Sequence, residues 1–326
     1  MRLMNESLLR VDNLHVTFHL KEGSVRAVRG ASLEVNDRES LGIVGESGSG
    51  KSVTSLAIMR LIKEPPGEVR ADRLLFEGRD VSKIRSRDMR SIRGKEISMI
   101  FQEPMTSFDP VFTIGQQLNE TIMLHQGLSK RESTRIAREM LEKVRIPSPE
   151  NTLKNYPHEL SGGMRQRAMI AMALSCRPRI LIADEPTTAL DVTIQAQVLQ
   201  LIKDLQAEFG MSLVMITHDL GVIAETTDRV VVMYGGKVLE VGTVFEIFKD
   251  TAQPYTRALL KSIPGVDDEK GKKLYAIPGN PPNPMNPPEG CPFNPRCPIV
   301  MDQCMKDFPP VKVLSPTHKA CCWRLQ

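Results

Sequence analysis

The stretch GESGSGKS at residues 45–52 matches the phosphate-binding pattern G-x-x-x-x-G-K-[ST]. An apolar run typical of a buried strand, Leu41–Val44, precedes it, and a segment with helical composition runs from Val53 to about Ile62. Between a strand and a helix, the glycines let backbone N–H groups converge on phosphate oxygens, and the helix N-terminus adds partial positive charge. The sequence therefore predicts a nucleoside triphosphate site on an α/β fold. We expect Lys51 to reach the β- and γ-phosphates and the Ser52 hydroxyl to bind Mg²⁺.

Length and composition are those of an ordinary globular protein with a large buried core. The chain has 326 residues, of which 41% are hydrophobic, and its formal net charge is +4. A net charge this small for the length, without an aromatic-studded basic stripe, gives no indication of nucleic-acid binding. The basic run Lys83–Arg90 is interpreted as a solvated helix face, with a binding patch as the alternative.

Nothing in the sequence predicts a membrane span or export. No apolar segment approaches the roughly 18–20 residues that a membrane-spanning helix requires. The N-terminal segment lacks the apolar core of a secretory signal peptide. We therefore expect the chain to stay in the cytoplasm, where its six cysteines would not form disulfides.

Two segments before the glycine-rich loop alternate apolar and polar residues, which predicts strands with one buried face. The apolar positions are Leu14, Val16 and Phe18 in the first segment and Ala31, Leu33 and Val35 in the second. The aromatic ring of Phe18 has two interpretations that the sequence leaves open. It stacks on a nucleotide base, or it belongs to the core.

Three later apolar runs predict buried strands that end in polar or titratable side chains. The runs are Ile97–Phe101, followed by Gln102; Arg179–Glu185, which ends in two carboxylates; and Ser212–Thr217, followed by His218. Because the carboxyl ends of parallel strands meet at one edge of a sheet, these groups are expected beside the glycine-rich loop.

The paired carboxylates at the end of the second run are costly to bury unless charge lies opposite them. Asp184 fits Mg²⁺, directly or through water, and Glu185 fits a group that positions and polarises an attacking water. A structural ion pair is the alternative. For His218, a γ-phosphate contact is favoured over a structural role because of its place at a strand end.

Helical spacing in Thr113–Gln126 and Ser129–Val144 predicts a helical insertion between two strands. A second glycine-rich turn, Leu160–Gln166, opens a predicted helix at Met164–Ser175 with Ser161 as its N-cap. The residues alone leave two interpretations of this turn open, phosphate binding or close helix packing. The remaining predicted elements are a helix at Gln195–Glu208 and a β-hairpin with strands Val230–Tyr234 and Lys237–Val241.

In order and type, these motifs resemble those of an ATPase subunit of an ABC transporter over essentially the whole chain. The glycine-rich loop corresponds to the P-loop, and LSGGMRQ at residues 160–166 corresponds to the family signature. The other matching motifs are the glutamine loop at Gln102, the second acidic motif at Arg179–Glu185, the Asp loop at Ala189–Asp191 and the switch histidine at His218. The resemblance implies an α/β P-loop NTPase cassette with an antiparallel β subdomain and an α-helical insertion subdomain.

In that family, two cassettes pair head to tail, and ATP lies between the P-loop of one and the signature of the other. The resemblance implies Mg²⁺ held by Ser52, Gln102 and Asp184, and catalysis by Lys51, Gln102, Glu185 and His218. The implied nucleotide contacts are Phe18, Gly45, Glu46, Ser47, Gly48, Ser49, Gly50, Lys51, Ser52, Val53, Gln102, Ser161, Gly162, Gly163, Gln166, Asp191 and His218.

Closer still, the chain is similar to the branch that imports dipeptides, oligopeptides and nickel. The matching segments are ADEPTTALDVTIQAQ at 183–197, QEPMTSFDP at 102–110 and QPYTRALL at 253–260, where Gln253 replaces the usual His. This implies a motor for di- or oligopeptide import, with nickel or another small solute as the alternative. The implied partners are a second ATPase subunit, identical or different, two transmembrane permeases and, indirectly, an extracytoplasmic peptide-binding protein. The implied location is peripheral, at the cytoplasmic face of the membrane.

Two other classes of function fit less well. A soluble ABC protein acting on DNA or ribosomes usually has two cassettes or a long coiled-coil insertion, and neither is apparent. A regulatory module with inactive sites is opposed by the presence of Lys51, Glu185 and His218. We therefore expect hydrolysis, with the permease-binding groove near Glu103–Thr113.

We expect a nucleotide-binding domain over residues 1–255, with its helical subdomain at about 103–172, and a C-terminal extension over residues 256–326. The proline-dense segment Pro278–Pro288 in this extension is expected to be extended.

Five of the six cysteines lie beyond residue 290, in a segment with little apolar content, which suggests a metal staple. The spacing lacks the C-x₂-C pairs of common zinc sites, and its Cys-Pro steps loosely resemble iron–sulfur ligation. Some members of the importer branch with this tail are associated with a [4Fe-4S] cluster. The resulting hypothesis is a cluster on Cys291, Cys297, Cys304 and Cys321, with Cys322 spare; zinc and free thiols are the alternatives.

Overall fold

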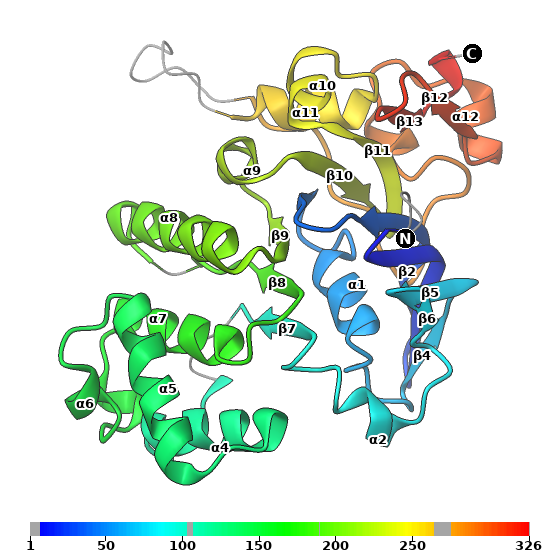
Figure 1. Cartoon of the computed structure of the whole chain (residues 1–326). Helices are drawn as coiled ribbons and strands as arrows, with labels where there is room; N and C mark the ends of the chain where they lie inside the picture. Colours follow the sequence, from blue (N-terminus) through cyan, green and yellow to red (C-terminus); the bar gives the residue numbers. More distant parts are fainter. Residues whose placement is uncertain (1–6, 103–106, 189, 264–274, 326) are drawn as a thin grey trace. The chain divides into compact units, whose positions relative to one another are not determined.

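The computed structural model describes residues 7–102, 107–188, 190–263 and 275–325, which form two compact units (Figure 1). Unit 1 comprises the chain up to Asn36, Ser40–Ser82 and the chain from Met215 on, and unit 2 comprises Asp37–Glu39 and Lys83–Val214. The chain passes from unit 2 to unit 1 within β9 (Ser212–Thr217). Both units join segments that are distant in the sequence, so the expected domain boundary at residue 255 stays a prediction.

Unit 1 contains an antiparallel sheet built on a long β-hairpin. Strand β1 (Leu9–Leu20) pairs with β2 (Gly23–Val35). On its other side, β1 pairs with β4 (Gly67–Arg70) and with β5 (Arg73–Phe76). Strand β5 pairs in turn with β6 (Arg79–Asp80). Leu14 and Val16 are fully buried, as the alternation of apolar residues predicts. Phe18 is half-buried.

A second sheet of unit 1 carries the glycine-rich loop. Strand β3 (Ser40–Val44) runs parallel to β10 (Arg229–Tyr234), which forms the predicted hairpin with β11 (Lys237–Thr243). Strands β13 (Lys319–Cys321) and β12 (Val311–Val313) of the C-terminal extension continue the sheet from β11. The extension is thus part of the same sheet as the strand that leads into the loop, and Figure 1 shows β12 and β13 beside β11.

Helices of unit 1 connect these strands. They are α1 (Lys51–Ile58), α9 (Leu220–Thr226), α10 (Val244–Lys249), α11 (Pro254–Lys261) and α12 (Asp302–Lys306), with 3-10 turns η2 (Asn294–Arg296) and η3 (Trp323–Leu325). Helix α1 ends four residues before the predicted Ile62, since its last residue is Ile58. Arg60 adopts a left-handed φ of 50°, and the N–H groups of Arg60 and Leu61 bond to the carbonyls of Ala57 and Leu56. This is a Schellman-type end, which the pattern of side chains did not reveal.

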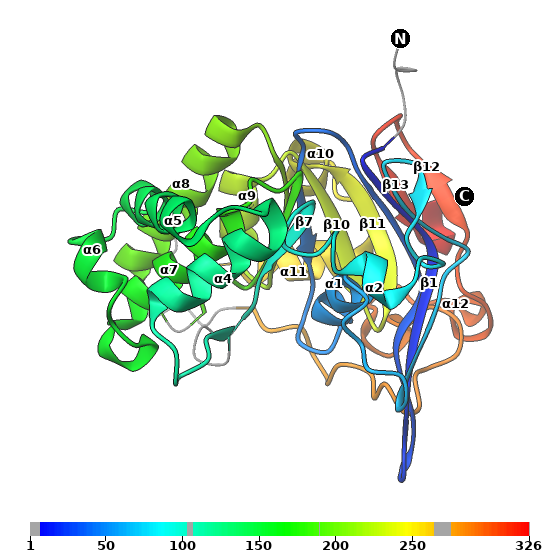
Figure 2. The ribbon, with the colours of Figure 1, turned by 60° about the horizontal axis from the view of Figure 1, so that its bottom comes forward.

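Unit 2 contains a parallel strand pair and a group of helices. Strand β7 (Ile97–Ile100) pairs with β8 (Ile180–Asp184). The helices are α2 (Ser86–Met89), α4 (Ile114–Gln126), α5 (Lys130–Lys143), α6 (Pro149–Thr152), α7 (Gly162–Leu174) and α8 (Val192–Phe209), with the 3-10 turn η1 (Pro157–Glu159). Figure 2 shows α4, α5, α6 and α7 grouped together. Capping boxes at Thr113 and Ser129 start α4 and α5 where the sequence predicted these two helices.

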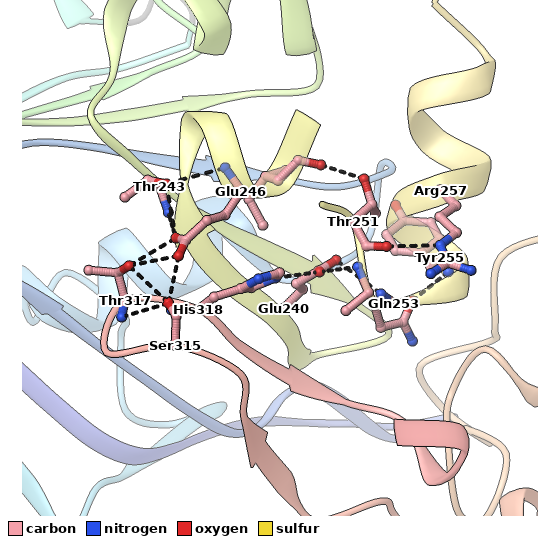
Figure 3. A network of polar contacts seen from close by, with 12 residues as sticks. Glu240, Thr243, Glu246, Thr251, Gln253, Tyr255, Arg257, Ser315, Thr317 and His318 are labelled. Atoms are coloured by element: carbon pink, nitrogen blue, oxygen red, sulfur yellow. Dashed lines mark hydrogen bonds and ion pairs between the residues drawn. The ribbon is translucent and has the colours of Figure 1, made fainter. Parts of the chain in front are cut away.

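Two glutamates attach the extension to the rest of unit 1 (Figure 3). Glu240 is 1% exposed, lies 2.9 Å from Nε2 of His318, and accepts hydrogen bonds from the backbone N–H groups of Ala252 and Gln253. Glu246 accepts hydrogen bonds from the side chains of Ser315 and Thr317 and from the N–H and hydroxyl of Thr243. Residues 315–318 of the extension are therefore held by carboxylates of β11 and α10.

We expect Glu246→Gln to lower stability at pH 7 by about 1–3 kcal/mol, because hydrogen bonds to a charged acceptor are stronger than those to a neutral one. Burial alone would raise the pKa of Glu246, but the bonds from Ser315, Thr317 and Thr243 lower it from 4.5 to about 2. Because the folded pKa is lowered, the stabilisation is present above pH 4.5 and is lost as the pH falls towards about 2.

Urea unfolding of the full chain at several pH values between 7 and 3 checks this expectation. The difference between wild type and Glu246→Gln should shrink as the pH falls, whereas an exposed control, Glu22→Gln, should stay near wild type throughout. A difference that is the same at every pH would contradict the assigned role of this carboxylate.

Candidate active site

The glycine-rich loop lies in unit 1 between β3 and α1, in the strand–turn–helix setting that the sequence predicts. All three of its glycines have positive φ angles: +152° at Gly45, +76° at Gly48 and +98° at Gly50. A Cβ at Gly45 would lie 2.1 Å from the carbonyl oxygen of Met233, and one at Gly50 would lie 2.5 Å from that of Ala27. Only glycine fits either position, so neighbouring strands fix the shape of the loop.

Lys51 is the first residue of α1, and it is 6% exposed. Its Nζ donates to the carbonyls of Gly45 and Glu46, at 2.8 and 3.1 Å, so the ammonium group lies across the loop. Ser52 and Val53 follow in the first turn, where helix N–H groups have no acceptor within the helix. The Oγ of Ser49 is buried and has no hydrogen-bond partner among the described residues. The buried hydroxyl of Ser49 and the position of the loop at the N-terminus of α1 both fit a loop that binds phosphate.

The second residue of the loop is held from outside the loop. The N–H of Glu46 donates to the hydroxyl of Tyr255 at 2.9 Å. The carboxylate of Glu46 accepts two hydrogen bonds from Arg296, at 2.6 and 3.1 Å. The sequence singled out Tyr255 only as part of the QPYTRALL segment and gave Arg296 no role, because nothing local links either residue to a loop some 200 residues away.

The predicted carboxylates lie in unit 2, at the end of β8. Asp184 is 4% exposed and is the last residue of the strand. Glu185 follows with a left-handed φ of 46°, an uncommon conformation for a residue other than glycine. Its Oε2 accepts hydrogen bonds from Nε2 of Gln102 and from Oγ1 of Thr188, both at 3.0 Å. Unit 2 therefore brings Gln102 and Glu185 together as predicted, and Thr188 is a partner that the sequence did not indicate.

The signature turn of unit 2 starts helix α7. Ser161 is its N-cap and accepts a hydrogen bond from the N–H of Met164, as predicted. Ser161 and Gly162 are exposed, and a Cβ at Gly162 would meet no atom within 4 Å. Gln166, by contrast, is 2% exposed and donates to the carbonyl of Pro186. The turn thus presents Ser161 and Gly162 to solvent, while Gln166 ties α7 to the residue after Glu185.

The structure also describes the surroundings of His218, Asp191 and Phe18, which the sequence predicted as site residues. His218 is exposed between β9 and α9, and the side chain of the adjacent Asp219 caps α9. Asp191 is exposed and caps α8 by accepting from the N–H of Ile194. Phe18 lies opposite Val25 and Gly67 in its sheet. Ala189 and Glu103–Thr106, which the sequence included in the Asp loop and the permease groove, lie outside the described residues.

The cysteines of the extension surround one small cavity. Cys291, Cys297, Cys304, Cys321 and Cys322 all contribute to the lining of a cavity of about 20 Å³. Burial raises the pKa of Cys291 to about 12 and that of Cys321 to about 11. No group of three or more His, Cys, Asp or Glu residues in the described part of the chain is arranged to hold a metal ion.

The structure therefore does not support the predicted iron–sulfur ligand set. The cysteines gather as expected, but the cavity has room for about one water molecule, and a four-iron cluster is much larger.

A P-loop in one unit, with a carboxylate-bearing strand and a signature helix in the other, defines an ATPase cassette of the ABC type. The family described as "ABC transporter" matches residues 28–188, and "Oligopeptide/dipeptide transporter, C-terminal region" matches residues 239–304. The chain therefore belongs to the ATP-binding proteins of ABC transporters, in the oligopeptide/dipeptide branch, which confirms the resemblance seen in the sequence.

Relatives and solved structures give the extent of the similarity. The "Oligopeptide transport ATP-binding protein OppD" of Bacillus subtilis (strain 168) is 50% identical over 318 residues, 98% of this chain and 89% of that protein. The "Dipeptide transport ATP-binding protein DppD" of the same organism is also 50% identical, over 98% of this chain and 95% of that protein. The dimeric ATP-binding cassette MJ0796 bound to ADP and Pi aligns with a TM-score of 0.63 and 28% identity, over 72% of this chain and 98% of that chain.

Proposed function

We propose that this chain is the ATP-hydrolysing subunit of a membrane importer of di- or oligopeptides. The observation that carries the proposal is the match of residues 239–304 to the C-terminal region of oligopeptide/dipeptide transporters, beside a P-loop and acidic strand with every expected side chain. The relatives named above are ATP-binding proteins of oligopeptide and dipeptide transport. Nickel or another small solute is the alternative cargo, because cargo selection belongs to subunits that this chain does not contain.

In this proposal, the loop residues Gly45–Ser52 bind the triphosphate, and Lys51 turns from the loop carbonyls to the β- and γ-phosphates. Ser52, Gln102 and Asp184 would hold Mg²⁺, which would neutralise negative charge on the phosphates. Glu185 accepts a proton from the attacking water, and Gln102 and Thr188 hold its carboxylate in place. His218 contacts the γ-phosphate.

A second cassette completes the proposed site. Its Ser161, Gly162 and Gly163 contact the γ-phosphate bound to the P-loop of the first cassette. The exposure of Ser161 and Gly162 supports this role, since a turn that only packed helices together would be covered. ATP favours the closed pair and hydrolysis releases it, so that each cycle does work on the permeases.

The proposed assembly has two ATPase subunits, identical or different, and two transmembrane permeases fed by an extracytoplasmic peptide-binding protein. Among the described residues, no helix combines the length and hydropathy needed to cross a bilayer. We propose that the chain attaches peripherally to its permeases at the cytoplasmic face of the membrane.

Reconstitution of the full assembly in vesicles tests the cargo. ATP hydrolysis should rise when the binding protein is loaded with a dipeptide or oligopeptide, and labelled peptide should accumulate inside the vesicles. Stimulation by Ni²⁺ and not by any peptide would shift the proposal to the alternative cargo. Stimulation by DNA or ribosomes alone would overturn it.

We also propose a metal site in the cysteine-rich segment, because its five thiols line one cavity, although that cavity is too small for a cluster as it stands. Cys291, Cys297, Cys304 and Cys321 would bind an iron–sulfur cluster, or zinc as the alternative, if the cavity widened around the metal. We expect iron and acid-labile sulfide in chain purified without oxygen, and loss of the metal in a Cys304→Ser variant. A folded chain without iron, sulfide or zinc would contradict the proposal.

A further inference from the structure

Arg296 of the extension is fully engaged at the P-loop. Its side chain is 4% exposed, and both terminal nitrogens donate to the carboxylate of Glu46. The remaining donors bond to the hydroxyl of Tyr234 and to the carbonyls of Ile277 and Pro278. Bidentate hydrogen bonds between an arginine and a carboxylate are among the strongest in proteins, and they fix the relative orientation of the two side chains.

A cluster of aromatic rings supports the same contact. Tyr234 of β10, Tyr255 of α11 and Phe293 of the extension have ring centroids 4.4–5.4 Å apart, and each ring is at most 1% exposed. The hydroxyl of Tyr255 accepts the N–H of Glu46, and that of Tyr234 accepts from Arg296. Glu46 is thus held at its backbone by α11 and at its side chain by the extension.

A carboxylate in a phosphate-binding loop presents an electrostatic problem. Glu46 is the second residue of a loop that is to receive a triphosphate of several negative charges, and like charges at short range repel strongly in a partly buried site. The guanidinium of Arg296 neutralises this carboxylate and holds it in one place. Glu46 and Arg296 are separated by 250 positions in the sequence, so this neutralisation exists only when the extension is folded against the loop.

We propose that Arg296 is a positioning residue for ATP binding, through which the C-terminal extension neutralises and orients Glu46 of the P-loop. The inference rests on the proposed function, since it requires the P-loop to bind ATP. Arg296 ends η2, the turn that precedes Cys297, and Asn294 of the same turn donates to the carbonyl of Cys304. The fold of the cysteine-lined segment therefore determines the place of Arg296, and a change in that segment alters the affinity for ATP.

Equilibrium binding of a fluorescent, non-hydrolysable ATP analogue to the full chain tests this role. We expect Arg296→Met to raise the Kd by about tenfold or more, because it leaves a carboxylate without its partner beside the phosphates. Glu46→Gln in the Arg296→Met background should restore the Kd to within about threefold of Glu46→Gln alone, since the repelling charge is then gone. Arg257→Met removes an exposed arginine of α11 and should bind as wild type.

A role of Arg296 in packing alone would give a different result, because Glu46→Gln would then not rescue Arg296→Met. That outcome overturns the inference, and so does wild-type affinity in Arg296→Met. If Arg296→Met does not fold, as judged by its thermal unfolding, Arg296→Lys and Tyr255→Phe take its place. Both keep the core filled, and we expect each to weaken analogue binding by about threefold or more, from one weakened or lost hydrogen bond. Wild-type affinity in both would overturn the inference.

Failure of the inference is distinguishable from failure of the proposed function. If the wild-type chain binds no ATP analogue, or if Lys51→Met binds it normally, the nucleotide site itself is refuted. If wild type binds, Lys51→Met does not, and Arg296→Met equals wild type, only the role of Arg296 is refuted.

Discussion

Glu185→Gln is expected to lower the rate of ATP hydrolysis by about 10²–10³-fold, within the range for removal of a general base. The amide cannot accept a proton from water, but its oxygen can still accept the hydrogen bonds that Gln102 and Thr188 donate to Glu185. The left-handed backbone at this position is equally open to Gln, so the local structure should persist. ATP binding should therefore remain, and the closed pair of cassettes should accumulate.

Steady-state phosphate release and analytical ultracentrifugation with ATP measure the two effects. Glu208→Gln, an exposed carboxylate near the end of α8, is the matched control and should hydrolyse ATP at the wild-type rate. Undiminished turnover in Glu185→Gln would remove this residue from the role of base. Loss of analogue binding together with turnover would indicate a structural role instead.

Lys51→Met is expected to weaken ATP binding by about 30-fold or more, because hydrogen bonds to charged groups contribute about 1.5–3 kcal/mol each. The side chain is 6% exposed, and its methylene stem is replaced by one of similar length, so the packing of α1 should be kept. What is lost is the ammonium group that lies across the loop carbonyls. We expect the variant to fold normally, because the conformation of the loop depends on Gly45 and Gly50, which are unchanged.

Titration with the fluorescent analogue measures the Kd, and circular dichroism checks the fold. Lys63→Met, an exposed lysine beyond the end of α1, should bind the analogue as wild type does. Wild-type affinity in Lys51→Met would mean that the loop does not bind the triphosphate as proposed.

Local patterns were enough to predict most of the elements and the loop. The phosphate-binding pattern of Gly45–Ser52 consists of eight consecutive residues, so the sequence alone was enough to predict a loop between a strand and a helix, here β3 and α1. The contact of Gln102 with Glu185 followed from a rule about strand ends, because both side chains leave parallel neighbours β7 and β8.

Features that depend on residues far apart in the sequence could not be predicted from local patterns. Nothing near Arg296 or Glu46 indicates that the two pair, because the pairing is made by the folding of the extension. The end of α1 at Ile58 depends on one left-handed residue, Arg60, that no side-chain pattern marks. The cysteines were rightly grouped, yet their spacing contains no information on the volume that they enclose.

The way the extension joins the sheet has a consequence for any shortened form of the chain. Strand β13 covers β11 by pairing Glu240 with Ala320 and Val241 with Lys319. A chain cut after residue 255 would leave the backbone donors and acceptors of β11 open to strands of other molecules, the usual start of edge-to-edge aggregation. Strands β13 and β12 of the extension thus act as a built-in cap, and we expect such a fragment to aggregate before its catalytic competence can be examined.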